Sequence, residues 1–128
     1  MNGLRPTLFS RHGVVAAAHP QAAQAGAAML MNGGNAFDAA AATAAALNVV
    51  EPFMSGLAGL GLATCYVAAE KRVRTLDFVP NVPSRFLVER FTQREDLARG
   101  ALSVGTPGNF AGWAELVRAY RRKPLGEA

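Results

Sequence analysis

Few side chains in the first half of the sequence could take part in catalysis, and they are widely spaced. The two histidines, His12 and His19, flank an apolar stretch, and neither has a Ser, Cys or Asp at the spacing of a catalytic triad. Asp38 and Glu51 lie far apart on one expected helix, so the paired carboxylates of acid/base catalysis are not indicated. We therefore expect one histidine in a loop, the other at a helix cap, and Asp38 as a first-turn helix charge.

The single cysteine, Cys65, excludes an intrachain disulfide, and no metal-ligand spacing surrounds it. Its sequence neighbours are apolar, and no basic residue or histidine stands beside it to stabilise a thiolate. We expect a buried structural thiol, and we expect neither a metal nor a cofactor.

Two further segments could contact a ligand. The loop from Gly56 to Gly61 is rich in glycine, and its amides could hold a phosphate. However, it follows an expected helix and precedes an expected strand, the reverse of a dinucleotide fingerprint, and it lacks a Walker lysine. We interpret it as tight backbone packing.

Asp77 ends an expected strand before a proline-spaced loop, a position that suits either a functional carboxylate or an ordinary turn.

The elements that position these residues can be predicted from turn and cap signals. In the segment 32–52, NGGNAFDAAAATAAALNVVEP, the two glycines end one helix, Asn35 caps the next, and Pro52 ends it. The first helix runs from His19-Pro20 to about Asn32. The second, from Ala36 to about Val49, is small or apolar on every face, so it expects more protein around it than a small independent domain supplies. The close seam of the first helix consists of Ala22, Ala25, Gly26, Met29 and Leu30.

The remaining sequence predicts strands and a third helix. A short buried strand is expected at Val14–Ala18, and a hairpin is expected from strands at 62–69 and 73–78 with a turn at 70–72. Residues 79–99 predict a crossing loop with a short helix near 92–99, and a brief apolar piece follows at 102–104. Thr106 or Asn109 is expected to cap the third helix. Its apolar face is expected to consist of Phe110, Trp113, Ala114, Val117 and Tyr120, with Glu115, Arg118 and Arg122 turned outward.

Length and charge limit the classes of function. The 128 residues are 51% hydrophobic, which favours one globular unit over disorder. The net charge is +4, but Lys and Arg are absent from Gly13 to Ala69, and the densest basic group, 118–123, lies at an expected helix C-terminus. We interpret that group as a solvated helix end, with a small basic binding module as a weaker alternative and no nucleic acid expected.

No segment is long and apolar enough to span a bilayer, and the first thirteen residues show no signal peptide. As it stands, the chain is expected to be cytoplasmic.

From about Gly13 onward the sequence resembles the opening of the large subunit of the gamma-glutamyltranspeptidase family. The motifs stand in the family's order: N-G-G-N-A-x-D-A-A-A, then V-E-P with S-G and a glycine-rich loop, then the strand ending in Leu76-Asp77, then V-G-T-P-G at 104–108 with Gly112 after it. The resemblance implies an α/β fold that is part of the αββα sandwich of an N-terminal nucleophile hydrolase. Residues 1–128 would then be a single incomplete domain, the N-terminal portion of such a large subunit.

The same resemblance implies a chemistry. Members of the family are precursors that cleave themselves, and the new N-terminal threonine of the small subunit attacks the gamma-glutamyl amide of glutathione or a related compound. The family places its processing site beyond Ala128, so no catalytic residue is assigned here, and the chain alone is expected to be inactive. Its expected partners are the remainder of the large subunit and the Thr-bearing small subunit. Because relatives are often periplasmic or extracellular, the localisation of the whole enzyme is left open.

The sequence departs from the family where the glutamyl α-carboxylate would be held. The family usually has an arginine shortly after the strand-ending Asp, and Val79 aligns with it; Arg85 lies nearby at a spacing that does not match. An isopropyl group cannot replace a bidentate guanidinium contact. Substrate-binding residues are therefore left unassigned. A divergent acylase for a non-glutamyl substrate and a non-catalytic scaffold or partner subunit both stay open as alternatives.

Overall fold

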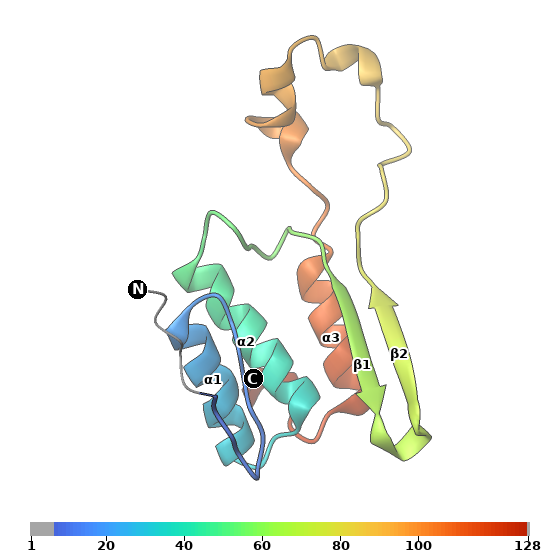
Figure 1. The fold of residues 1–128 in the computed structure, drawn as a ribbon. Coiled ribbons are helices and arrows are strands. Elements are labelled where there is room, and N and C mark those ends of the chain that lie inside the picture. Colours follow the sequence, from blue (N-terminus) through green and yellow to red (C-terminus); the bar gives the residue numbers. More distant parts are fainter. Residues whose placement is uncertain (1–6, 128) are drawn as a thin grey trace.

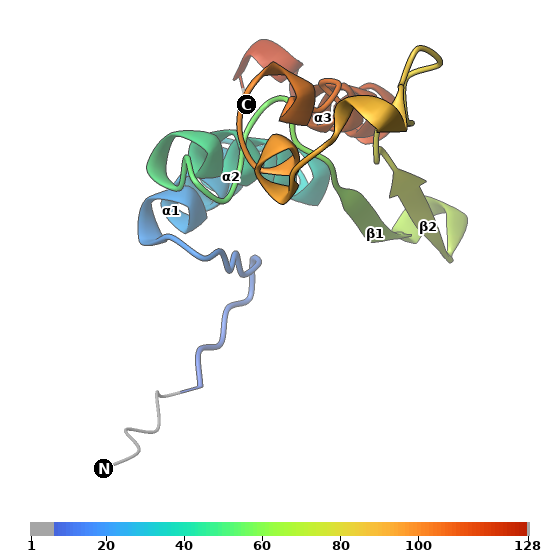
Figure 2. The ribbon, with the colours of Figure 1, turned by 90° about the horizontal axis from the view of Figure 1, so that it is seen from above.

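In the computed structural model, which describes residues 7–127, helices form one layer and a β-hairpin lies on one side of it (Figure 1, Figure 2). Helix α2 lies between α1 and α3, and the hairpin lies next to α3 (Figure 1). The mixed α/β character expected from the sequence is confirmed. The α-helices are α1 (Pro20–Met31), α2 (Ala36–Val50) and α3 (Asn109–Tyr120), and the strands are β1 (Leu62–Val67) and β2 (Arg72–Asp77).

The corner between α1 and α2 follows from local capping. Gly33 adopts a φ of +85°, which ends α1, and the Gly34 N–H donates to the Met29 carbonyl at 3.0 Å. Asn35 caps α2: its side chain accepts from the Asp38 N–H, and the Asp38 carboxylate accepts from the Asn35 N–H at 2.9 Å. The predicted corner is confirmed.

Small residues let α1 and α2 lie close together, as predicted for the seam. A Cβ on Gly26 would overlap the Thr43 side chain, so this position requires glycine. The core cluster between the two helices consists of Met29, Ala39 and Ala42, with Leu30 packed against it. On the other side, α2 is not enclosed, because Ala36 and Ala40 are exposed in this structure.

Helix α3 packs on α2 through a face that differs partly from the predicted one. Trp113 and Val117 meet Ala41 in a second core cluster, as expected, but Phe110 is 51% exposed and only rests its ring edge-on against Trp113. The predicted side-chain cap is wrong, because the N-cap is Gly108. Asn109 is the first helical residue, and its side chain turns to another partner described below. The buried residues of α3 are Asn109, Gly112, Trp113, Leu116 and Val117.

The predicted hairpin is confirmed, with a shift at its turn. β1 and β2 pair antiparallel from Leu62 opposite Asp77 to Val67 opposite Arg72. β1 ends two residues earlier than predicted because Ala68–Glu70 form a turn of 3-10 helix, and Lys71 closes it with a φ of +52°. The hairpin therefore turns tightly and leaves its strands in an uninterrupted register.

Two other expectations fail or hold only in part. The strand predicted at Val14–Ala18 is absent, because no strand of residues 7–127 pairs with this segment. The segment 79–104, called the arm below, projects away from the helix layer (Figure 1). Its predicted short helix is a single 3-10 turn, Arg94–Leu97, and the apolar piece at 102–104 falls in another, Ala101–Ser103.

The expectation about a leader concerns residues 1–13, of which 1–6 lie outside the described residues.

Candidate functional site

The end of β2 is fixed by the ring of Phe78, which lies between two glycines. A Cβ on Gly61 or on Gly112 would overlap this ring. The Phe78 N–H also donates to the Gly61 carbonyl at 3.1 Å. Contacts of the ring with both glycines and one backbone hydrogen bond thus hold residues 77–79 against the glycine-rich loop and α3.

The residues just before and after Phe78 form a small turn on the surface. The Asp77 carboxylate accepts a hydrogen bond from the Val79 N–H at 2.9 Å, so Asp77 caps the turn that leads out of β2. The Val79 side chain is 44% exposed beside it. The contact of Asp77 supports the turn interpretation, and Val79 is presented to solvent from a rigid position.

The glycine-rich loop is held by Asn109, a contact that sequence reasoning missed. The Asn109 side chain donates to the Gly56 carbonyl at 2.9 Å, and its backbone N–H donates to the Gly59 carbonyl at 3.0 Å. A Cβ on Gly59 would crowd the Gly56 carbonyl. Tight backbone packing, the interpretation preferred from the sequence, therefore describes this loop. An asparagine directly after a P-G at a helix start was the signal available, but it was interpreted as a cap.

A groove lies beside this loop. It is lined by Phe53, Met54, Leu60 and Asn109, among others. Phe53 and Met54 are almost fully exposed around it. The hydroxyl of Ser55, which also lines the groove, donates to the Asn48 side-chain oxygen at 2.6 Å, while the buried Asn48 amide nitrogen has no partner within residues 7–127.

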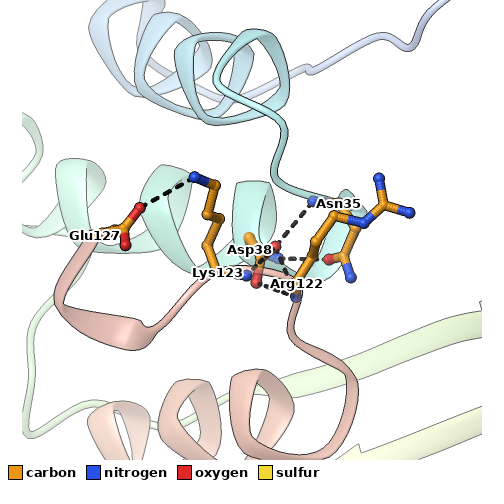
Figure 3. A network of polar contacts seen from close by, with 5 residues as sticks. All are labelled: Asn35, Asp38, Arg122, Lys123 and Glu127. Carbon is orange, nitrogen blue, oxygen red and sulfur yellow. Dashed lines mark hydrogen bonds and ion pairs between the residues drawn. The ribbon is translucent and has the colours of Figure 1, made fainter.

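Asp38 does far more than place a charge in the first turn of α2. Its side chain is fully buried and accepts from the backbone N–H groups of Arg122 (3.1 Å) and Lys123 (3.2 Å), as well as from Asn35 (Figure 3). The Asn35 side chain adds a bond to the Tyr120 carbonyl at 2.7 Å. This cluster joins the α1–α2 corner to the end of α3. The sequence signal for it was a single acid, Asp38, in a long stretch without other charged residues.

Some of the charged side chains on the surface form ion pairs, at the hairpin turn and around the end of α3. The Arg74 guanidinium, which donates to the Glu70 carboxylate at 2.7 Å, holds the pKa of Glu70 below its ordinary value, with help from Arg72. Arg118 lowers the pKa of Glu115 in the same way. Within the basic group 118–123, Arg118 is thus neutralised by Glu115, and Lys123 lies 3.3 Å from Glu127. The solvated helix end is the interpretation that these contacts support.

The structure brings together only some of the residues singled out from the sequence. The glycine-rich loop, Asp77 and Val79 meet at the N-terminal end of α3, since Gly108 lies against the Phe78 carbonyl. His19 accepts from the Gln21 N–H at the start of α1, as predicted for a helix cap, and His12 lies exposed in a loop.

Cys65 and Arg85 lie outside this assembly. Cys65 is half-buried and lines a small cavity between the hairpin and α3, and Arg85 is exposed on the arm. In the described part of the chain, no three His, Cys, Asp or Glu side chains gather as metal ligands, and no helix is long and apolar enough to cross a membrane.

Comparison with known proteins gives one consistent result. The profile of a family described as gamma-glutamyltranspeptidase matches residues 22–128. Acylase ACY 1 proenzyme of Pseudomonas sp. (strain SE83) is 36% identical over 96% of this chain. Glutathione hydrolase proenzyme of Bacillus subtilis (strain 168) is 37% identical over 90% of it. The chain spans 24% and 21% of these two relatives, so it corresponds to less than a quarter of their length.

Solved structures agree with the sequence comparison. Cephalosporin acylase from Bacillus halodurans superimposes with a TM-score of 0.88 at 33% identity, covering 99% of this chain and 24% of that one. Gamma-glutamyltranspeptidase of Helicobacter pylori superimposes with a TM-score of 0.86 at 30% identity, covering 95% of this chain and 36% of that one. The helix corner, the hairpin and α3 are thus arranged as in two larger proteins, one named gamma-glutamyltranspeptidase and the other cephalosporin acylase.

Proposed function

Because this chain belongs to the gamma-glutamyltranspeptidase family, we propose that it forms the N-terminal part of the large subunit of an N-terminal nucleophile enzyme. The proposed enzyme cleaves an amide and transfers the acyl group to water or to an amine. The match over residues 22–128, together with relatives about four times as long, is the observation that carries the proposal. The fold resemblance to both named enzymes supports the same reaction class.

In the proposed reaction the nucleophile comes from sequence outside these 128 residues. The hydroxyl oxygen of an N-terminal threonine attacks the amide carbonyl carbon, and the threonine's own amine takes the proton. The amine product leaves with that proton, and water or an acceptor amine then releases the acyl group from the ester. Backbone N–H groups stabilise the oxyanion in both steps. Nothing in this sequence is assigned to these roles, so its proposed contribution is scaffold and, around Val79, one wall of the acyl site.

Gamma-glutamyl amides of the glutathione type are the proposed acyl donors, with weak selectivity for the glutamyl group. A glutamyl donor carries an α-carboxylate that a guanidinium would hold by two charge-assisted hydrogen bonds. The resemblance puts that contact at Val79, whose isopropyl group offers no donor. Loss of such a contact removes about 1.5–3 kcal/mol of recognition.

A non-glutamyl acyl group is the second candidate, and two observations favour it. Val79 is half-exposed at a fixed turn, so an apolar surface stands where a charged one is expected. Two of the proteins similar to this chain are named as acylases. In this case the enzyme would be an amidohydrolase for an uncharged acyl chain.

A matched series of substrates separates the two candidates. The protein from the complete reading frame is assayed with the gamma-glutamyl, glutaryl and butanoyl anilides, which differ only in the α-amine and the carboxylate. Similar kcat/KM values for all three support weak selectivity, and a strong preference for the butanoyl anilide supports the acylase candidate. A large preference for the gamma-glutamyl anilide would show that the carboxylate is held elsewhere, and hydrolysis of none of the three would refute the proposed function.

A further inference from the structure

Three segments meet at the start of α3, and Gly108 touches the other two. A Cβ added to Gly108 would lie 2.5 Å from the Phe78 carbonyl oxygen and 3.3 Å from the Pro80 ring, both just beyond β2. It would also lie 3.4 Å from the Gly59 carbonyl oxygen of the glycine-rich loop. The φ of Gly108 is −99°, which any residue can adopt, so lack of space and not backbone conformation requires glycine here. Because the nearest atom belongs to the Phe78 backbone, a side chain at position 108 would displace the turn that carries Val79.

The next residue, Asn109, holds the glycine-rich loop from the same place. Its side chain is buried and donates to the Gly56 carbonyl at 2.9 Å. The first two backbone N–H groups of α3, those of Asn109 and Phe110, donate to the carbonyls of Gly59 (3.0 Å) and Leu57 (3.4 Å). Since Gly108 offers no side-chain cap, the loop carbonyls are the partners that the start of α3 requires. The loop and the start of α3 therefore stabilise each other.

The same loop holds the end of β2. Its last glycine, Gly61, accepts the hydrogen bond from the Phe78 N–H, and Phe78 directly precedes Val79. The position of Val79 thus depends on the start of α3 in two ways: through the loop that Asn109 holds, and through the contact of Gly108 with the Phe78 carbonyl.

We propose that Gly108 and Asn109 are positioning residues that hold Val79 in the wall of the acyl site and so contribute to binding of the acyl group. The inference rests on the proposed function, which puts Val79 in that wall. A displaced wall weakens binding of substrate and transition state alike, so it raises KM and leaves kcat nearly unchanged. A loss of folded protein differs, because it lowers the apparent kcat and leaves KM unchanged.

Asn109→Asp tests the loop contact, with Asn35→Asp as the matched control. Each substitution keeps the side-chain size and replaces an amide that donates to a distant carbonyl, that of Gly56 or that of Tyr120, by a carboxylate that cannot donate. Tyr120 is the last residue of α3, so the control perturbs the other end of this helix. In the complete protein, we expect Asn109→Asp to raise the KM of the anilide substrate at least about fivefold with kcat changed less than about twofold. We expect Asn35→Asp to leave KM unchanged.

Two kinetic results would overturn the inference and leave the proposed function standing. One is a KM in Asn109→Asp equal to that of the unsubstituted enzyme, and the other is an equal rise of KM in Asn109→Asp and Asn35→Asp.

Gly108→Ala tests the direct contact in the same assay. Gly26→Ala is its control, because a Cβ there would overlap the Thr43 side chain in the seam between α1 and α2. We expect Gly108→Ala to raise KM and Gly26→Ala to lower the stability of the protein without raising KM. A folded Gly108→Ala enzyme with an unchanged KM would contradict the proposed role of Gly108.

Hydrogen exchange gives a readout that needs no substrate. In Asn109→Asp, the Phe78 amide is expected to exchange at least about tenfold faster relative to the paired amides of β1 and β2, and in Asn35→Asp at an unchanged relative rate. Faster exchange of this amide in Asn109→Asp, when the unsubstituted protein hydrolyses no anilide, would support the positioning of the turn and contradict the proposed function. An unchanged rate in Asn109→Asp would overturn the inference whatever the activity.

Discussion

The carboxylate of Asp38 accepts a hydrogen bond from the backbone N–H of Arg122, 84 residues away in the sequence, at 3.1 Å. The contact joins the start of α2 to the second residue after α3, and the N–H of the neighbouring Lys123 donates a further hydrogen bond to the same carboxylate (Figure 3). Because Asp38 is fully buried, each of these N–H groups would lose its partner if the carboxylate were removed. Asp38 therefore adds a polar connection between α2 and the end of α3 to the hydrophobic cluster of Ala41, Trp113 and Val117.

Asp38→Ala is expected to lower the free energy of unfolding by about 3–5 kcal/mol, because it empties a fully buried site and leaves three part-buried backbone N–H groups unpaired. The measurement is urea unfolding of the complete protein. Arg122→Ala keeps the backbone N–H and is expected to cost less than about 0.5 kcal/mol, whereas Arg122→Pro removes it. Equal effects of Arg122→Ala and Arg122→Pro would show that the side chain, not the backbone, carries the contact.

Gly112→Ala is expected to destabilise the protein by about 1–3 kcal/mol, because its methyl group overlaps the Phe78 ring. Gly56→Ala is the control, since a Cβ there meets open space. Thermal unfolding measures both. A double variant with Phe78→Leu should recover part of the lost stability. Strict additivity of the two substitutions would contradict the close contact between the Phe78 ring and Gly112.

Val79→Arg is expected to raise kcat/KM for the gamma-glutamyl anilide by about tenfold to a hundredfold over the butanoyl anilide, since it restores a donor for the α-carboxylate. Val82→Arg, on the exposed arm, is the matched control. The ratio of the two kcat/KM values is the readout, because a general change in stability would move both together. An unchanged ratio in Val79→Arg means that residue 79 does not face the acyl group.

The pH response of Glu70 follows from its two arginine partners. Its pKa lies below the ordinary 4.5, first because of the Arg74 hydrogen bond, so its stabilising contribution is present at neutral pH and is lost as the pH falls through this lowered pKa. A carbon-detected NMR titration should show a Glu70 midpoint below 4.5, the ordinary value for a glutamate side chain. Arg74→Gln should bring the Glu70 midpoint back up, and high salt should do so in part. A Glu70 midpoint that ignores both changes would contradict the pairing.

Elements whose conformation depends on residues close together in the sequence could be predicted. Elements that depend on contacts between residues far apart in the sequence could not. The α1–α2 corner depends on Gly33, Asn35 and Asp38, which lie within six positions of one another, so its capping signals were legible. The strand predicted at Val14–Ala18 failed because a strand needs a partner, and no described residue supplies one. The sequence predicts a cap at Asn109 because no residue near it in the sequence indicates a hydrogen bond to the Gly56 carbonyl.

The candidate site was predictable only through the resemblance. The Val79 side chain has no polar or ionisable group, and it is a candidate site residue only because the family usually has an arginine at this position. Its rigid setting depends on the Phe78 ring and on two glycines far apart in the sequence, Gly61 and Gly112, which no spacing rule connects. The long-range contacts of the site are therefore findings of the structure.

Mass spectrometry of the protein expressed from its complete reading frame tests the central claim most directly. We predict two chains, of which the larger contains all of residues 22–128 and the smaller begins with threonine, and amide hydrolysis that requires both. A single uncleaved chain without hydrolytic activity would contradict the claim that this sequence is the scaffold of an N-terminal nucleophile enzyme.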